Sequence, residues 1–511
     1  MPNRLYVVRT ALIVALGGFL MGFDASVISG VVGFIETEFA LTKLQLGWAV
    51  SSLTLASTFA MMVSGPLADR YGRRPMLFLA AALYAISAIT SAIAPTFDAL
   101  VIARMVGGLG VGASLIIAPM YIAEISPSAM RGQMVSFNQL NIVIGISVAF
   151  FSNFLILKLA GAPGGGPLGM TGNEWRWMLG VEALPAVLYF VGLFFVPRSP
   201  RWLIQHGRKA EALPIMAMAV GGVAATQEAD EIEHSLQNES ATAKTPLREL
   251  FSPALRLVLV IGAVVGILQQ ITGINAVFFY APTIFEQSGI GTDAAFAQAI
   301  LVGLINLVFT VVAILYIDKL GRRPLLIAGL VGITLSMGVL AFGFGQATYT
   351  LPATATVEGA DLSPLVGQTF DSDVAFKAAL AATLGAEAAG ESEAALIAQA
   401  ISMNPLLVLL GVLGFVASFA VSLGPVMWVL FSELFPMRVR GLAISFVGLI
   451  NSAVSFLVQL VFPWELDVLG SATTFLVFGL FAAAGLLFVW RMVPETKGKT
   501  LEELEAQLVH A

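Results

Sequence analysis

Long apolar runs separated by short polar stretches fill the chain from residue 11 to residue 492. A helix that crosses a hydrocarbon core of roughly 30 Å needs about 20 mostly apolar residues. The runs therefore predict twelve membrane-spanning helices, near 11–33, 46–67, 76–94, 98–123, 133–158, 177–197, 256–287, 296–317, 324–344, 405–432, 441–463 and 471–492. The first run follows Arg4 and Arg9, but its length and the lack of a small-residue cleavage pattern distinguish it from a signal peptide.

Composition agrees with this pattern and excludes several classes of protein. Of the 511 residues, 58% are hydrophobic and 11% are charged, whereas soluble proteins carry roughly 25% charged residues. The net charge of −6 argues against nucleic acid as a partner. Because the chain has no cysteine, disulfide scaffolds, thiol catalysis and zinc knuckles are excluded together. The sequence predicts an all-α membrane protein in a lipid bilayer, without a metal site.

Basic residues predict the orientation of the chain. If the N-terminus is cytoplasmic, all but five of the 26 Lys and Arg residues fall on the cytoplasmic side or in the tail. Basic loops remain on that side during insertion, so both termini are expected to be cytoplasmic.

Two polar segments interrupt the apolar pattern. Residues 198–255 are charged and predict a cytoplasmic linker of short helices between a first half, 1–197, and a second half, 256–492. Residues 345–403 predict an extracytoplasmic insertion, with one or two amphipathic helices over 374–401. Residues 493–511 form a cytoplasmic tail in this interpretation.

A repeat supports the division into halves. The stretch from Asp69 to Pro75 follows the second span, and a similar stretch from Asp318 to Pro324 follows the eighth. Spans four and ten are each followed by a glutamate, with an Arg-Gly pair seven residues later. Two pseudo-symmetric six-helix halves with a binding site between them are typical of a transporter that works by alternating access.

The motifs together resemble those of a known family. They are the two Gly-Arg-Arg loops, Pro119 to Glu124 with Arg131-Gly132, Gln269 to Asn275, Gly424 to Trp428, and Pro494 to Gly498. In this combination they resemble the sugar porters of the major facilitator superfamily, and especially the bacterial proton-coupled D-xylose and hexose symporters. Those proteins are similar in turn to the facilitative glucose transporters. The resemblance implies a monomeric transporter in the bacterial inner membrane, not an enzyme, with a monosaccharide substrate and no cofactor besides a coupling proton.

Asp24 in the first span and Arg104 in the fourth are candidates for proton coupling. A carboxylate in a low-dielectric cavity favours its neutral form, and a nearby arginine favours the ionised form. A movement that separates the two would change proton affinity, whereas the alternative is a permanent ion pair between helices. The resemblance favours coupling, because family symporters have an Asp matching Asp24. Glu182 in span six is a second buried acid, for which a helix-terminal or interhelical hydrogen bond is an equally good interpretation.

Amide side chains provide the donors and acceptors that sugar hydroxyls need, and an aromatic plane suits a sugar's C–H face. The residues of this kind, which also match the family's sugar contacts, are Gln139, Gln269, Gln270, Asn275, Asn306, Trp428 and Asn451. Singly, each amide also fits hydrogen bonding between helices, Asn306 above all, and Trp428 fits interface packing. Gly266 and Gly273 ahead of Pro282 predict a break in span seven beside Asn275.

The resemblance also assigns a gate and a latch. Phe279 and Tyr280 match an outer gate in which relatives commonly have two tyrosines, and Ser452 replaces a tryptophan of close relatives. A cytoplasmic charge latch between the halves would use Arg73, Glu124, Arg131, Arg201, Arg322, Glu433 and Arg440. Relatives have Glu where this chain has Arg198, which alters that latch. Phosphate binding is a second interpretation of the Gly-Arg-Arg loops, although their spacing fits neither a P-loop nor a dinucleotide motif.

Three functions remain open from the sequence. The first is a proton/monosaccharide symporter, and the second is a sugar uniporter in which Asp24 is only structural. The third is a sugar sensor that does not transport; the short linker and tail offer it no obvious signalling output.

Overall fold

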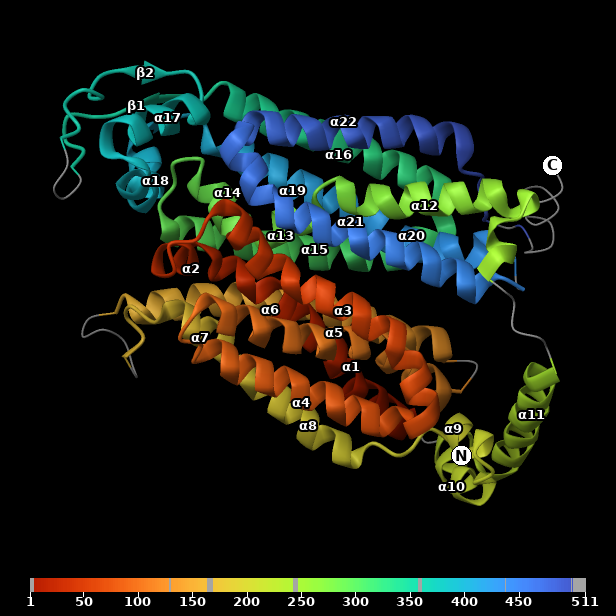
Figure 1. Cartoon of the computed structure of the whole chain (residues 1–511). Helices are drawn as coiled ribbons and strands as arrows, with labels where there is room; N and C mark the ends of the chain where they lie inside the picture. Colours follow the sequence, from red (N-terminus) through yellow and green to blue (C-terminus); the bar gives the residue numbers. More distant parts are fainter. Residues whose placement is uncertain are drawn as a thin grey trace. The chain divides into compact units, whose positions relative to one another are not determined.

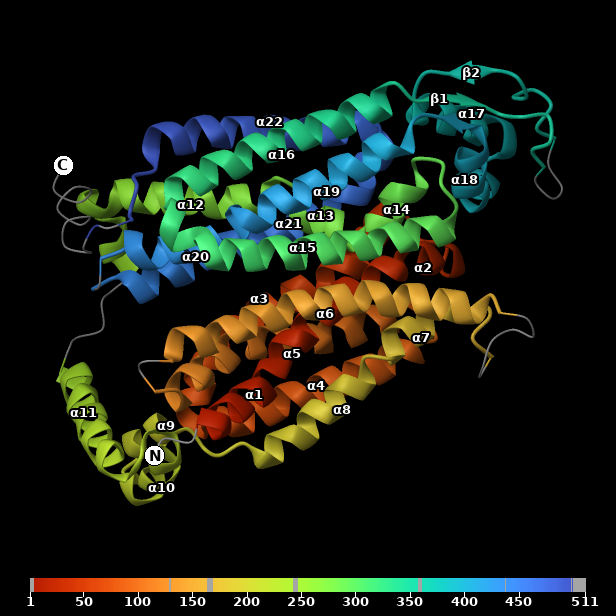
Figure 2. The same ribbon diagram turned by 180° about the vertical axis from the view of Figure 1, so that it is seen from behind.

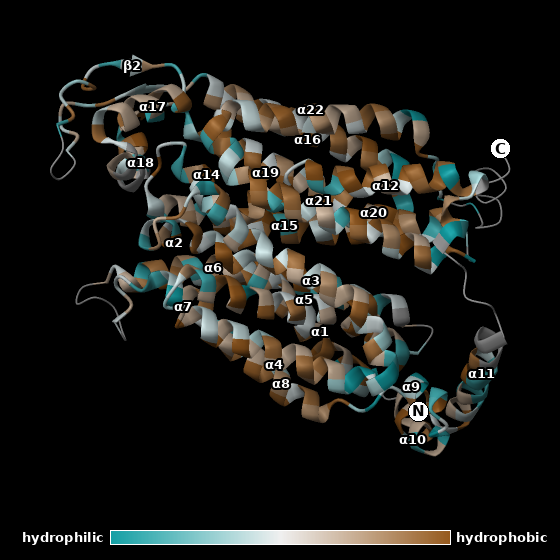
Figure 3. Cartoon of the chain, viewed as in Figure 1, coloured by the Kyte–Doolittle hydropathy of each residue, from teal (hydrophilic) through white to brown (hydrophobic). Residues whose placement is uncertain are grey.

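The computed structural model of the chain describes residues 4–127, 130–162, 169–241, 247–356, 361–436, 438–497 and 499, and it consists mainly of long helices (Figure 1). Twelve segments of the described residues are long and apolar enough to cross a membrane, which confirms the predicted number of spans. Figure 3 shows apolar residues along these helices, with hydrophilic residues frequent near their ends. The chain divides by its internal contacts into two compact units.

The first unit comprises Met1–Val27, Ser52–Ala149 and Trp175–Thr245. Its helices are α1 (Arg4–Val27), most of α3 (Lys43–Tyr71), α4 (Arg73–Ala92), α5 (Phe97–Ile125), most of α6 (Arg131–Ala160), α7 (Glu174–Gly180), α8 (Ala183–Gly192) and the 3-10 turn η3 (Leu193–Phe195). The predicted linker helices are also present here: α9 (Pro200–Gln205), α10 (Lys209–Val220) and α11 (Gly222–Ala241).

Small residues allow the helices of the first unit to pack closely around α1. A side chain on Gly22 would bring its Cβ within 2.0 Å of the carbonyl oxygen of Ile142, so α1 and α6 touch backbone to backbone. The core beside them contains Ala11, Ala15 and the fully buried Tyr84 and Tyr189. Because glycine has no Cβ at the closest contact, the two helix backbones approach each other more closely than they could with a larger residue there.

The second unit comprises Ile28–Ser51, Phe150–Glu174 and Pro246–Ala511, so it includes segments from the first six predicted spans. Its helices are η1 (Ile28–Gly30), α2 (Val32–Glu38), η4 (Leu247–Phe251), η5 (Pro253–Leu255), α12 (Arg256–Ile271), α13 (Ile274–Phe279), α14 (Ala281–Glu286), α15 (Thr292–Leu320), α16 (Arg322–Gly345), α17 (Asp373–Leu384), α18 (Ala386–Ala400), α19 (Pro405–Val421), α20 (Leu423–Leu434), α21 (Arg440–Val468) and α22 (Gly470–Met492). Helix α16 packs against α19 and α22, as Figure 2 shows from behind.

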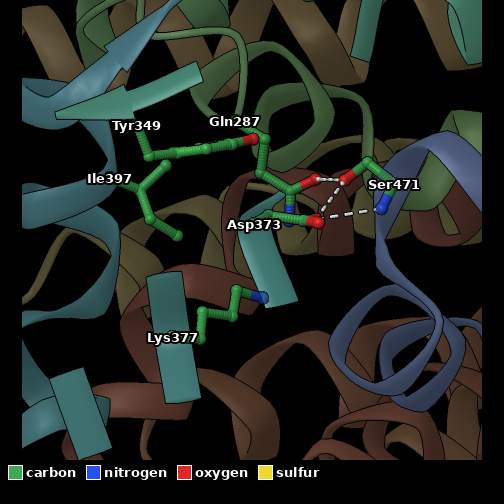
Figure 4. A pocket seen from close by; sticks show the side chains of 6 residues that line it. All are labelled: Gln287, Tyr349, Asp373, Lys377, Ile397 and Ser471. Atoms are coloured by element: carbon green, nitrogen blue, oxygen red, sulfur yellow. Dashed lines mark hydrogen bonds between the residues drawn. The ribbon is translucent and has the colours of Figure 1, made fainter. Parts of the chain in front are cut away.

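The insertion between α16 and α19 has a small core of its own. Its helices α17 and α18 fall where the sequence predicted one or two helices. Three short strands, which the sequence did not predict, form an antiparallel sheet in the order β2-β1-β3, with bounds β1 (Thr348–Thr350), β2 (Thr369–Phe370) and β3 (Ile401–Ser402). Asp373 attaches the insertion to the start of α22, because its carboxylate accepts from the backbone N–H of Ser471 at 3.0 Å (Figure 4).

Candidate functional site

In the first unit, an acid and an arginine are buried together between α1 and α5. Oδ1 of Asp24 accepts a hydrogen bond of 2.9 Å from Nη1 of Arg104, and each residue is 2% exposed. The structure thus brings the two predicted coupling residues into direct contact. Gly107 leaves room for the acid, since a Cβ there would lie 2.7 Å from Asp24 Oδ2. A buried charge of this kind is costly unless it is paired.

Two polar atoms of this pair have no hydrogen-bond partner in the part of the chain that the structure describes. Among the described residues, Asp24 Oδ2 and Arg104 Nε find no hydrogen-bond partner. Glu182, which is 3% exposed, lies within electrostatic reach of both residues, and its Oε1 is also without a partner there. Two acids beside one arginine leave one negative charge uncompensated when both acids are ionised. Such an arrangement can hold a proton without a large movement of the helices.

In the second unit, three buried amides and the half-buried Asn275 form a continuous hydrogen-bonded cluster. Asn451 Nδ2 donates to Gln269 Oε1 at 2.7 Å, and Gln270 Nε2 donates to the same oxygen at 3.0 Å. Asn275 Nδ2 donates to Gln270 Oε1 at 2.8 Å. Four of the predicted sugar-contact residues are therefore linked, and they come from α12, α13 and α21.

The predicted break in span seven is confirmed and explains how Asn275 joins this cluster. Helix α12 ends at Ile271, Gly273 adopts a left-handed conformation with φ of 91°, and α13 starts at Ile274. A side chain at Gly273 would also meet the ring of Phe478 at 2.6 Å, so glycine is required there for two reasons. The break turns Asn275 toward α21 while Gln269 and Gln270 remain on α12.

Two further polar residues belong to the cluster but were missed from the sequence. Ser455 Oγ accepts from Asn275 Nδ2 at 2.7 Å and from Gln459 Nε2 at 2.8 Å. Ser455 and Gln459 follow Asn451 by four and eight residues, so all three lie on one face of α21. That spacing was the signal available in the sequence.

The other predicted sugar-contact residues are not hydrogen-bonded to this cluster in the described structure. Asn306 is buried in α15. Trp428 in α20 is 46% exposed, and its ring meets Phe431 edge-on at 5.9 Å. Gln139 is exposed on α6 in the first unit. The exposed amide of Gln139 and the exposed ring of Trp428 are compatible with a solute contact. A solute contact stays a prediction for all three residues.

The two predicted gate residues are buried where the second part of the broken span meets α14. Phe279 ends α13, and Tyr280 lies between α13 and α14. The Tyr280 ring packs against Phe462 at 5.2 Å between centroids, and its hydroxyl donates to the backbone carbonyl of Gln459 at 3.5 Å. Tyr280 therefore contacts the same helix, α21, that carries the polar cluster.

Four of the seven predicted latch residues form matching ion pairs, one within each unit. In the first unit, Arg73 Nη2 lies 2.8 Å from Glu124 Oε1, and in the second, Arg322 Nη2 lies 2.7 Å from Glu433 Oε1. Arg440 Nε donates to the carbonyl of Phe435 at 3.1 Å. Of the remaining two, Arg201 is half-buried in α9, and the side chain of Arg131 lies outside the described residues. A latch between the halves stays a prediction.

Twelve spans, with a buried acid–arginine pair in one unit and a polar amide cluster in the other, define a polytopic membrane transporter. Residues 10–360 and 375–508 match the family of sugar (and other) transporters. The chain belongs to this family, which places it among transporters and not among enzymes.

Two named transporters and a solved structure are similar to this chain over almost its whole length. The D-xylose-proton symporter of Escherichia coli is 34% identical over 99% of this chain and 96% of its own length. The arabinose-proton symporter of Bacillus subtilis is 33% identical over 98% of this chain and 94% of its own. The inward-open structure of the xylose transporter XylE from E. coli superimposes with a TM-score of 0.76, at 32% identity, over 98% of this chain and all of that one. The fold is that of the major facilitator superfamily.

Proposed function

We propose that this protein transports a monosaccharide together with a proton, across the inner membrane of a bacterium. The observation that carries the proposal is the buried pair of Asp24 and Arg104, in which one carboxylate oxygen has no hydrogen-bond partner among the described residues. An uncoupled carrier needs no ionisable group inside its spans, and such groups are expensive to bury. Similarity to symporters named for xylose and arabinose supports both the proton and the substrate class.

The amide cluster supplies the chemistry for a neutral, hydroxyl-rich solute. Gln269, Gln270 and Asn451 offer donors and acceptors without a net charge, so they can exchange bonds among themselves for bonds to sugar hydroxyls. Because these bonds replace one another, the dehydration of the polar groups is partly compensated in both states. A sugar would bind in place of some of these mutual bonds.

Proton binding at Asp24 would be linked to the conformational change. When the carboxyl is protonated, it loses its charge attraction to Arg104, and the arginine becomes free to pair elsewhere. A state in which the two residues are apart is then favoured by protonation, and a state in which they touch is favoured by proton release. Transport requires no cofactor in this scheme, and one chain with both halves is the functional unit.

The proposal is tested by transport in proteoliposomes. D-xylose, D-glucose, D-galactose and a polyol are offered as radiolabelled solutes, with and without an imposed pH gradient. We expect at least one monosaccharide to accumulate above its external concentration when the gradient is present and to equilibrate when a protonophore removes it. Equilibration at the same rate and extent in both conditions would contradict coupling, and transport of the polyol alone would contradict the substrate class.

A further inference from the structure

The helices that follow the repeated Gly-Arg-Arg loops begin in the same way. Gly72 precedes α4 with φ and ψ of 96° and 154°, and Gly321 precedes α16 with 94° and 161°. In each case two arginines and a proline form the first turn. The first backbone N–H groups of a helix have no intrahelical acceptor, and they favour an anion. At both loops, a negatively charged group is therefore expected to bind the first backbone N–H groups of the helix.

In the second unit a carboxylate of the chain meets this need. Glu495 Oε1 accepts from the backbone N–H of Arg322 at 3.1 Å, and Oε2 accepts from that of Arg323 at 3.1 Å. The carboxylate lies so close to Gly321 that a Cβ there would be 2.6 Å from Oε2. The next residue, Thr496, donates to the latch acid Glu433 at 2.6 Å. The segment Pro494-Glu495-Thr496 thus anchors on the latch and caps α16.

In the first unit the corresponding segment carries the opposite charge. Ser199 donates to Glu124 as Thr496 does to Glu433, which aligns Pro197-Arg198-Ser199 with Pro494-Glu495-Thr496. Arg198 therefore occupies the sequence position of the capping glutamate. Within the described chain, no acceptor bonds to the backbone N–H groups of Arg73 and Arg74.

A cavity lies where the missing carboxylate would be. Its volume is about 140 Å³, and four arginines line it: Arg73, Arg74, Arg198 and Arg208. Tyr71 and Trp202 also line this cavity, and Trp202 packs against Gly72, where a Cβ would be 3.3 Å from its ring. For comparison, a cavity of about 150 Å³ accepts a benzene molecule. The space is larger than one carboxylate needs.

Carboxylates neutralise only part of the charge around this cavity. Arg73 is paired with Asp69 at 2.9 Å and with Glu124, and Arg208 is paired with Glu211. In contrast, Arg74 donates to the backbone carbonyls of Leu193 and Phe194. Arg198 is exposed and forms no ion pair with another described residue. Glu211 lies close enough to interact with its charge without direct contact.

We propose that this cavity, lined by Arg73, Arg74, Arg198 and Arg208, is a binding site for a phosphate group. The phosphate would replace the carboxylate that Glu495 supplies in the other half, with oxygens on the N–H groups of Arg73 and Arg74. A phosphate suits the site better than a carboxylate, because it has more acceptor oxygens and a larger volume. It would come from a soluble phosphate ester or from a lipid headgroup. The site does not depend on the transported solute.

Binding is measured on the full-length protein, purified in a phosphate-free detergent without added lipid. Inorganic phosphate and glucose 6-phosphate are titrated calorimetrically, with acetate as the carboxylate comparison. In a second arm, the melting temperature is measured in nanodiscs of phosphatidylcholine with and without phosphatidylglycerol, since the extra anionic headgroup is the lipid source. Binding of the soluble ligands identifies a solute site, and stabilisation by phosphatidylglycerol alone identifies a lipid site.

Variants in the two halves make the test specific. Arg198→Glu restores the arrangement of the second half, so we expect about tenfold to hundredfold weaker phosphate binding and a higher melting temperature without phosphate. Arg74→Gln should also weaken binding, whereas Arg323→Gln, the matching change in the other half, should leave it unchanged. The proposal is overturned if neither ligand source binds, if acetate binds as well as phosphate, or if Arg198→Glu and Arg323→Gln behave alike.

Discussion

Asn275 Nδ2 donates a hydrogen bond of 2.7 Å to Ser455 Oγ and thereby joins the broken span seven to α21. This contact extends the amide cluster by one turn beyond Asn451. It also brings a hydroxyl that the sequence did not single out into the proposed sugar site.

We expect Ser455→Ala to weaken sugar binding by up to about tenfold, because a hydrogen bond is worth roughly 0.5–1.5 kcal/mol and tenfold corresponds to about 1.4 kcal/mol. Ser445→Ala is a matched control on the same helix, since that exposed hydroxyl donates only to its own backbone at Gly441. The KM for uptake of the accepted sugar measures both variants. Equal KM values for Ser455→Ala and the wild type would show that Ser455 does not take part in sugar binding.

The orientation of the chain is testable because it contains no cysteine. Val223 in α11 and Ala353 in the insertion are both exposed, so each can be replaced singly by cysteine. We expect an impermeant maleimide to label Ala353→Cys in intact cells, and Val223→Cys only after the membrane is opened. The reverse pattern would contradict the orientation predicted from the basic residues.

The latch pairs differ in burial and should differ in their contribution to stability. The side chains of Arg73 and Glu124 are 6% and 8% exposed, whereas those of Arg322 and Glu433 are 10% and 24% exposed. Removing one partner of a buried pair costs about 3–5 kcal/mol, and an exposed pair contributes about 0–1 kcal/mol. Thermal unfolding in detergent should therefore rank Glu124→Gln as the most destabilising change, then Glu433→Gln, with the exposed Glu211→Gln close to wild type. A different order would show that burial does not set these energies.

The insertion should lose stability in acid. Burial raises the pKa of Glu393, but the charges of Lys377 and Lys43 outweigh burial and hold that pKa below its usual value. A depressed pKa in the folded state gives stability that is complete above the unfolded pKa, near 4.3, and is lost as pH falls through the folded value. We expect Glu393→Gln to lower the melting temperature at pH 7 and to match the wild type at pH 3. A constant difference between the two proteins over this range would contradict the ion pair of 2.9 Å with Lys377.

The sequence predicted those features that depend on local pattern. Apolar runs predicted the twelve spans, and two glycines and a proline predicted the break at Gly273. The sheet of the insertion was not predictable, because β1 to β3 have only two or three residues each, and Tyr349 pairs with Phe370 and Ile401 across long separations. Ser455 was overlooked because a single serine in an apolar helix is ordinary. Its four-residue spacing from Asn451 was a weak signal, and the hydrogen bond from Asn275 shows its role.

For the charged residues too, the sequence showed unusual residue types but not their partners in space. Asp24 and Arg104 were recognisable as costly residues within spans, and the structure adds their direct contact. The reversed charge at Arg198 was visible in the sequence as a departure from relatives. Its consequence at the start of α4 emerged only from comparison with Glu495 in the other half.

Proton coupling at Asp24 is tested most directly by comparing the wild type with Asp24→Asn in proteoliposomes, while sugar flux and external pH are recorded together. We expect sugar entry to raise external pH in the wild type and in Asp361→Asn, which changes an exposed acid of the insertion. In Asp24→Asn, counterflow exchange of the sugar should persist while the pH change and uphill accumulation disappear. Uphill accumulation with an unchanged proton signal in Asp24→Asn would contradict the central claim.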